Sequence, residues 1–231
     1  MSHDSATLIS IETSTELASV ALLYRGQRFS RESLGAQTHS VTVPGMIQAV
    51  LKEAGIRSSD CDAIAFGAGP GSFTGVRTAC GLAQGLAFGA NIPVVPVVTL
   101  LAMAERARAT GANNILSVID ARMGEVYWAQ YQFDDGWKTV TEPGLSPASL
   151  VRASGLPTMC GNGLIAYQND LLHLEVSNQL SEVMPHATEM LSLALAAMQE
   201  GKAVHAREAQ PLYLRNKVAL TTRERMAGVS A

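Results

Sequence analysis

The residues that most directly suggest chemistry in this sequence are the glycines of residues 66–90, "FGAGPGSFTGVRTACGLAQGLAFGA". The first three, Gly67, Gly69 and Gly71, precede a helical pattern, and backbone amides at a helix N-terminus attract anions such as phosphate. A P-loop would also need a lysine, and a dinucleotide-binding turn would need the spacing G-x-G-x-x-G. The segment meets neither requirement, because no lysine is near and Ser72 and Thr74 occupy the positions of the third glycine.

Two interpretations of this loop stay open, a phosphate contact and a helix cap that needs no ligand. In the first, Gly69, Gly71, Ser72 and Thr74 would surround the anion. In the second, the hydroxyl of Ser72 or Thr74 accepts a hydrogen bond from the first amides of the helix. We favour the cap.

The later glycines of the segment recur every fourth residue, at Gly81, Gly85 and Gly89, and therefore share one face of the predicted helix. Each costs about 1 kcal/mol relative to alanine inside a helix. Small residues allow a neighbouring helix to approach closely. The stripe predicts either tight packing within this chain or an interface with another subunit, and the spacing does not separate the two.

Composition and charge describe an ordinary globular protein of 231 residues, 47% hydrophobic and 16% charged, with a formal net charge of −3. No strongly basic surface for nucleic acid is apparent. The three cysteines form no C-x-x-C pair, which favours reduced, buried thiols. No signal sequence and no apolar run of about 18 residues is present, so we expect a cytoplasmic protein without a membrane span.

The pattern of the first half predicts three strands, then alternating helices and strands. Pro44 lies inside the first helical segment, which predicts a kink or a late start there. Thr99 is expected to cap the third helix. The predicted strands cover residues 7–11, 17–24, 27–35, 61–67 and 92–98. The predicted helices cover residues 38–54 and 100–109, with a further helix directly after the glycine loop.

The second half repeats this order in a shorter form. It begins with strands at residues 115–120, 125–133 and 137–144, with Asp135-Gly136 as a hairpin signal. A helix at "SPASLVRAS" follows, then "PTMCGNG", another helix, "LEVS", and a long helix at residues 186–201.

The repetition predicts a duplicated α/β architecture, in which each half is a mixed sheet flanked by helices and the second copy is compressed. The polar, glycine-containing residues 109–114 are the predicted hinge. We therefore expect one domain at residues 1–110 and a second at residues 111–231, with a frayed tail from about residue 221.

Five blocks of the sequence closely resemble the bacterial TsaB family, also called YeaZ. They are "LISIETSTELASVAL", "GAGPGSFTGVRTACGLAQGLAFG", "PVVPVVTLLAMA", "ILSVIDARMGEVYWAQY" and "PLYLRNKVAL", in the order typical of the family and spread over nearly the whole chain. The resemblance implies two tandem RNase-H-like domains, the fold of the actin, Hsp70 and sugar-kinase group.

The resemblance also implies a function in making N6-threonylcarbamoyladenosine at position 37 of tRNAs. Proteins of this family bind TsaD, the larger paralogue that transfers the threonylcarbamoyl group, and they work with the ATPase TsaE. The implied role is a non-catalytic subunit with no cofactor of its own, with ATP or ADP at the interface with TsaD and TsaE. It further implies a homodimer when TsaD is absent, and contact with tRNA only through the complex.

The resemblance places the partner interface on the first two helices. A contact of this kind favours small and apolar residues, and Arg77 is the single charge of the second helix. The residues expected to contribute are His39, Val43, Met46, Ile47, Val50, Val76, Arg77, Cys80, Gly81, Ala83, Gln84, Gly85 and Ala87.

The metal-binding pair of TsaD-type relatives, H-x-x-x-H on the first helix, is broken here. His39 would be its first member, but position 43 is a valine. We therefore expect no metal site and no peptidase activity. His39 is interpreted as a surface or helix-start residue.

The actin-like nucleotide site of the superfamily has a carboxylate near the end of the first strand. Glu12 occupies this place, and Asp120 occupies the comparable place in the second half. Facing each other across a cleft, they would allow an independent nucleotide-dependent enzyme, the alternative function. We favour the simpler interpretation, in which Glu12 accepts hydrogen bonds from the amides of "TST" and Asp120 ends a strand.

Overall fold

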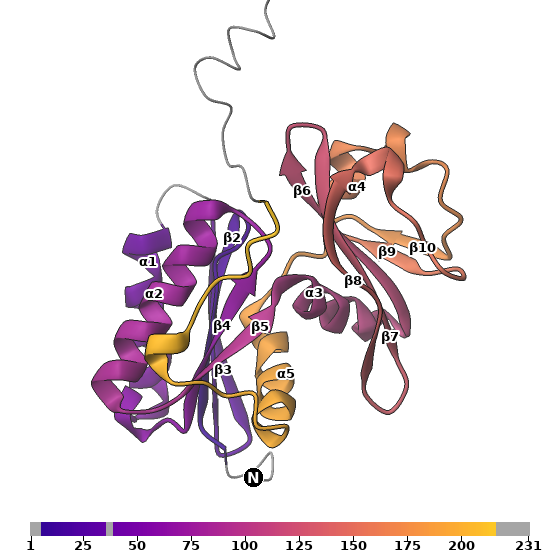
Figure 1. Cartoon of the computed structure of the whole chain (residues 1–231). Helices are drawn as coiled ribbons and strands as arrows, with labels where there is room; N and C mark the ends of the chain where they lie inside the picture. Colours follow the sequence, from indigo (N-terminus) through magenta and orange to yellow (C-terminus); the bar gives the residue numbers. More distant parts are fainter. Residues whose placement is uncertain (1–5, 36–38, 216–231) are drawn as a thin grey trace, which may run out of the picture.

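The computed structural model describes residues 6–35 and 39–215, and its N-terminal half is built on a five-stranded mixed sheet (Figure 1). The strands lie in the order β3-β2-β1-β4-β5; β1 pairs antiparallel with β2 and parallel with β4. They are β1 (Leu8–Glu12), β2 (Leu17–Tyr24), β3 (Gln27–Leu34), β4 (Ala63–Gly69) and β5 (Val94–Val98).

Helices cover both faces of this sheet, which explains why β1, β2 and β4 are nearly continuous apolar runs. Helices α1 (His39–Ala54) and α2 (Phe73–Ala90) pack on one face, where Ile9 and Ile11 contribute to the core. Helix α5 (Ala187–Gln199) packs on the other face, against Leu8 and its neighbours.

The second sheet repeats the strand order of the first, as β8-β7-β6-β9-β10. Its three long strands are antiparallel, and the two short ones run parallel to β6. The strands are β6 (Asn114–Arg122), β7 (Glu125–Phe133), β8 (Trp137–Pro147), β9 (Thr158–Cys160) and β10 (Asn178–Leu180). The predicted duplication and the compression of its second copy are confirmed.

The helix predicted at "SPASLVRAS" is wrong. Only one short 3-10 turn forms, η3 (Ala148–Leu150). The chain becomes extended at Val151, which has ψ 140° and is fully buried, so core packing stops the helix there. The helix predicted between "PTMCGNG" and "LEVS" is likewise one turn, α4 (Gly163–Ala166).

Two predicted helix starts also need correction. Thr99 is the first residue of α3 (Thr99–Ala107), follows the N-cap residue Val98, and makes no capping hydrogen bond with its buried hydroxyl. Pro44 does not delay α1, which already begins at His39. Proline leaves the carbonyl of Ser40 without its helical donor, but Ser40 is exposed and water can replace that donor.

The chain returns to the first sheet after completing the second. Helix α3 packs against the second sheet, whereas α5 covers the first. Val204 then pairs with Val94, and the following residues run alongside α2 (Figure 1). The predicted division at residue 110 places α5 in the second domain by sequence, although α5 packs on the sheet of the first domain. The tail expected to fray from residue 221 lies outside the described residues.

Within residues 6–35 and 39–215, no helix is long and apolar enough to span a membrane.

Candidate functional site

The junction between β4 and α2 is a helix cap. The Oγ atom of Ser72 accepts a hydrogen bond from the amide of Gly75 at 3.4 Å, and the amide of Ser72 donates to the carbonyl of Ser14 at 2.7 Å. Ser72 is thus the N-cap residue, as the favoured interpretation predicted. Thr74 lies two residues further, exposed, and its carbonyl accepts a hydrogen bond from the Thr78 hydroxyl.

The glycines of this junction allow the chain to lie directly against the turn after β1. A Cβ atom on Gly71 would come within 2.5 Å of the Ser14 carbonyl oxygen. One on Gly75 would overlap the Thr13 carbonyl oxygen, and one on Gly67 would overlap the carboxylate of Glu12. Gly69 has φ +99°, a conformation that favours glycine. The cluster of glycines between residues 67 and 75 is the feature of the sequence that indicates this close approach.

Glu12 is fully buried at the end of β1. Its Oε1 atom accepts a hydrogen bond from the Ser14 amide at 2.5 Å, which confirms the amide-capping interpretation. Its Oε2 atom has no partner among the described residues. Burial raises the pKa of Glu12 above its usual value of 4.5, while the hydrogen bonds with Ser14 lower it. Glu12 does not line the cleft described next, and neither does Gly69.

A cleft of about 510 Å³ lies between the two halves of the molecule. The turn after β1, the start of α2, the β6–β7 turn and residues 212–215 line it. Among the predicted site residues, the cleft brings together His39, Gly71, Ser72, Thr74, Val76 and Asp120. The alternative arrangement, in which Glu12 and Asp120 would face each other across a cleft, does not form, because of the two only Asp120 lines this space.

Asp120 forms its hydrogen bonds and its ion pair with residues of the second half of the molecule. Its Oδ1 atom accepts hydrogen bonds from the Arg122 amide at 2.7 Å and from the Tyr167 hydroxyl at 2.9 Å. Its Oδ2 atom pairs with the Arg122 guanidinium at 2.8 Å. These contacts hold the carboxylate at the rim of the cleft and pair it with the positive charge of Arg122.

His39 is a helix-start residue, as predicted, but it is not at the surface. It is 7% exposed, and its Nε2 atom donates a hydrogen bond to the Thr15 carbonyl at 3.0 Å. This bond ties the start of α1 to the β1–β2 turn. In the described part of the chain, no group of three or more histidine, cysteine, aspartate or glutamate residues could hold a metal ion.

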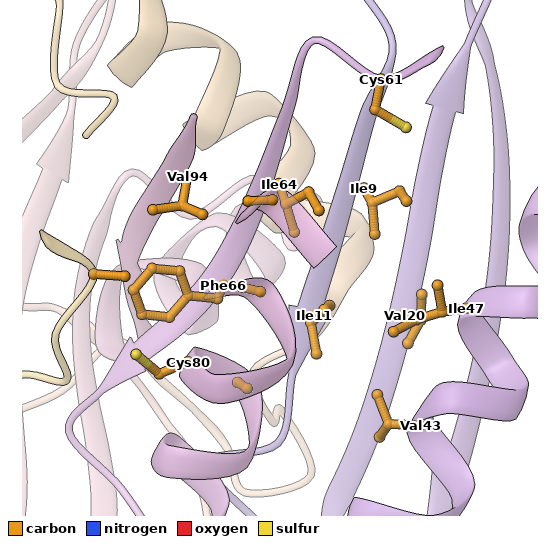
Figure 2. Close-up of a cluster of buried hydrophobic side chains, with 14 of the residues drawn as sticks. Ile9, Ile11, Val20, Val43, Ile47, Cys61, Ile64, Phe66, Cys80 and Val94 are labelled. Carbon is orange, nitrogen blue, oxygen red and sulfur yellow. The ribbon is translucent and has the colours of Figure 1, made fainter. Parts of the chain in front are cut away.

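Seven apolar residues expected in the partner interface are buried within the chain itself. Val43 and Ile47 point from α1 toward the sheet and lie near Val20, and Cys80 lies beside Phe66 (Figure 2). The apolar stripes of both helices are needed to cover the sheet. The seven buried residues are Val43, Ile47, Val50, Val76, Cys80, Ala83 and Ala87.

The glycine stripe lies on the opposite side of α2, facing away from the sheet. Gly81, Gly85 and Gly89 are outside the core, and a Cβ atom at each would meet nothing within 4 Å. Packing within this chain therefore does not explain these glycines in the described structure. Met46 and Gln84 are half-buried at the edge of this surface.

We call this surface the α1–α2 outer face. Besides the glycine stripe it contains Val41, which is 76% exposed, Gly45 and Phe88, which is 61% exposed, and Arg77. Apart from Arg77 these residues are small or apolar, and the glycines allow the backbone of another helix to approach closely.

The chain contains two sheets with the same strand order, each flanked by helices, and a cleft lies between the two halves. This architecture defines a duplicated RNase-H-like protein of the actin-like class. A family model described as "TsaD: tRNA N6-adenosine threonylcarbamoyltransferase" matches residues 33–148. Two relatives, from Escherichia coli and Haemophilus influenzae, are named tRNA threonylcarbamoyladenosine biosynthesis protein TsaB. They are 40% and 38% identical, and each alignment covers 92% of this chain and 96% or 94% of the relative.

The solved structure of YeaZ from Pseudomonas aeruginosa is 38% identical and superposes with a TM-score of 0.86, over 90% of this chain and all of that chain. The chain belongs to the TsaB (YeaZ) family.

Two glycine-to-alanine changes within α2 should have opposite effects on stability. Gly75→Ala places a methyl group against the Thr13 carbonyl, and we expect it to lower the free energy of unfolding by about 1–3 kcal/mol. Gly81→Ala meets open space and should raise it by about 1 kcal/mol. Urea unfolding of both variants measures this, and equal effects would contradict the described geometry.

Glu12→Gln should change the pH dependence of stability. Because burial raises the folded-state pKa of Glu12, the wild type loses stability as pH rises from the usual value of 4.5 through the folded-state value. The glutamine variant lacks this loss. Its free energy of unfolding relative to wild type should therefore increase between pH 5 and pH 8. A difference that does not vary with pH would mean that the carboxylate is already solvated in the folded protein.

Proposed function

We propose that this chain is a non-catalytic subunit of the complex that makes N6-threonylcarbamoyladenosine at position 37 of tRNA. It binds and supports a TsaD-type transferase, together with a TsaE-type ATPase. The names of the relatives support the pathway, since both are biosynthesis proteins for this modified nucleoside.

The observation that carries the proposal is the exposed glycine stripe of α2. Three glycines within one helix cost about 3 kcal/mol relative to alanine, and no contact within the described chain offsets this. A helix of a partner can occupy the space that the absent side chains leave. The α1–α2 outer face is therefore the proposed docking surface for TsaD.

The three cysteines do not supply a nucleophile, which is compatible with a non-catalytic role. Burial, together with the neighbouring Asp60 and Asp62, raises the pKa of the Cys61 thiol to about 12. Burial also raises the pKa of Cys160 to about 12 and that of Cys80 above its usual value. Because the thiolate is the nucleophile, these three thiols are inert at neutral pH.

The proposal also covers the nucleotide, the tRNA and self-association. We propose that the chain has no cofactor of its own, that ATP or ADP binds at the junction with TsaD and TsaE, and that tRNA is reached only through the complex. When TsaD is absent, a second copy of the chain occupies the α1–α2 outer face as a homodimer.

Replacing Gly85 by leucine should abolish TsaD binding. The new side chain would project from the middle of the glycine stripe and hold a partner helix several ångströms away. We expect the affinity for purified TsaD to fall about 100-fold or more, as for loss of a central interface contact. Calorimetry or co-purification measures this, and undiminished binding would show that the face is not the docking surface.

Ala196→Leu is the matched control. Ala196 is exposed on α5, on the opposite side of the first sheet, so the same added bulk should leave TsaD binding unchanged. Circular dichroism of both variants verifies that each is folded.

A second candidate function, an independent nucleotide-dependent enzyme, is favoured by the cleft of about 510 Å³ that Asp120 lines. It requires that the isolated chain bind ATP with magnesium and lose that binding in Asp120→Ala. We expect titration calorimetry of the isolated chain with ATP and magnesium to show no binding. Tight binding that Asp120→Ala removes would favour the enzyme over the supporting subunit.

A further inference from the structure

Arg77 stands out on the α1–α2 outer face because it is the single charged residue among the 18 of α2. It lies one turn before Gly81 and two turns before Gly85, so it shares their face. The face that the glycines leave open therefore contains one fixed positive charge.

Two aromatic rings hold the Arg77 side chain in place. The central guanidinium carbon lies 3.3 Å from the centroid of the Phe73 ring and 5.3 Å from that of Tyr213. Its Nε atom donates a hydrogen bond to the Tyr213 hydroxyl at 2.8 Å. Both rings are partly exposed, at 41% and 47%. A long side chain at the surface is thus ordered before any partner arrives, which lowers the entropic cost of binding through it.

Tyr213 is itself fixed by residues 209–215, which run beside α2. The amide side chain of Gln84 donates to the Ala209 carbonyl at 3.1 Å, and the Leu212 amide donates to the Ala68 carbonyl at 2.7 Å. Arg215 pairs with Glu125 of the second half at 2.5 Å. The C-terminal segment therefore helps to build the docking surface, which the sequence patterns of α1 and α2 alone did not indicate.

The Arg77 guanidinium has no counter-charge in the described part of the chain, where no carboxylate lies within 4.0 Å of it. The two helices contain one carboxylate, Glu53, and it is already paired with Arg31 at 2.5 Å. In a two-fold dimer the same patch meets itself. Two copies docked through α1 and α2 would therefore leave both Arg77 side chains without a free carboxylate.

We propose that Arg77, framed by Phe73 and Tyr213, is the charged anchor of the docking surface and binds an aspartate or glutamate on the partner. This inference rests on the proposed function. It identifies the TsaD-type subunit as the partner that fits the α1–α2 outer face best. The contacting helix of that subunit is expected to have small residues and one carboxylate. The guanidinium keeps its planar η edge for that carboxylate while Nε holds the tyrosine.

Titration of purified TsaD with Arg77→Ala, Arg77→Lys and Tyr213→Phe, at 50 and 300 mM NaCl, tests this. Losing one member of a hydrogen-bonded interface ion pair should weaken binding roughly 30-fold in Arg77→Ala. Wild-type affinity should fall with salt, and the alanine variant should lose most of that dependence. Arg77→Lys and Tyr213→Phe should fall between wild type and alanine, since each retains the charge but loses part of its fixed geometry.

Arg25→Ala is the matched control. Arg25 is also exposed and lies over a tyrosine ring, 5.0 Å from the centroid of Tyr24, but it belongs to the turn between β2 and β3. We expect it to bind TsaD as the wild type does. Self-association of the chain, measured by light scattering, should be unchanged or stronger in Arg77→Ala, because the unpaired charges are removed.

Three results would overturn the inference. If Arg77→Ala binds like Arg25→Ala while Gly85→Leu fails to bind, the anchor is wrong but the docking surface stands. If Arg77→Ala and Gly85→Leu both bind normally, the docking surface itself is wrong. If Arg77→Ala weakens self-association as much as it weakens TsaD binding, the guanidinium serves the contact between copies of this chain.

Discussion

The close approach between the turn after β1 and the start of α2 is the constraint on which the other features depend. The Ser14 carbonyl lies where a side chain at position 71 would stand, and the Thr13 carbonyl where one at position 75 would stand, so both positions require glycine. The approach is strengthened by the Ser72 amide, which donates to Ser14, and by the Thr13 hydroxyl, which donates to the Gly75 carbonyl at 2.7 Å. These bonds fix the direction in which α2 leaves the sheet.

With its direction fixed, α2 has two faces of different character. The inner face, with Ala79, Cys80 and Ala83, completes the core over β4, where Cys80 lies beside Phe66 (Figure 2). The outer face has glycines where an ordinary surface helix has long polar side chains. Glycines lower the helix propensity of this face. If another helix covers the face, the free energy of close helix packing offsets that cost.

The same junction also forms one wall of the cleft, yet Glu12, the carboxylate at the end of the first strand, is not among the residues that line it. Glu12 turns inward and accepts the Ser14 amide, so that it strengthens the junction and does not reach the open space. Asp120 remains at the rim, held by Arg122 and Tyr167. The chain thus has the fold of an actin-like protein, but the carboxylate at the end of its first strand, Glu12, stabilises the fold and does not line the cleft.

The sequence predicted most of the fold, because both halves show clear apolar periodicity and the same strand order. It did not predict that α5 covers the first sheet, since contacts such as that of the Ser10 hydroxyl with the Ala187 carbonyl join residues far apart in the chain. The residues expected in the interface come from two different faces of α1 and α2, the buried face toward the sheet and the exposed outer face. Val43, Ile47 and Val50 have the i, i+4, i+7 spacing of a core stripe, and this signal alone would have assigned them to the interior.

The position of Tyr213 could not be predicted either, because no local pattern connects it with Arg77, 136 residues earlier.

The most direct measurement is the amount of N6-threonylcarbamoyladenosine formed on tRNA by purified synthase, TsaD and TsaE, with and without this chain, determined by mass spectrometry of the nucleosides. If the chain is the supporting subunit of the transferase, omitting it should reduce the modification to background, and the chain without TsaD should form none. Unchanged modification in its absence would contradict that role.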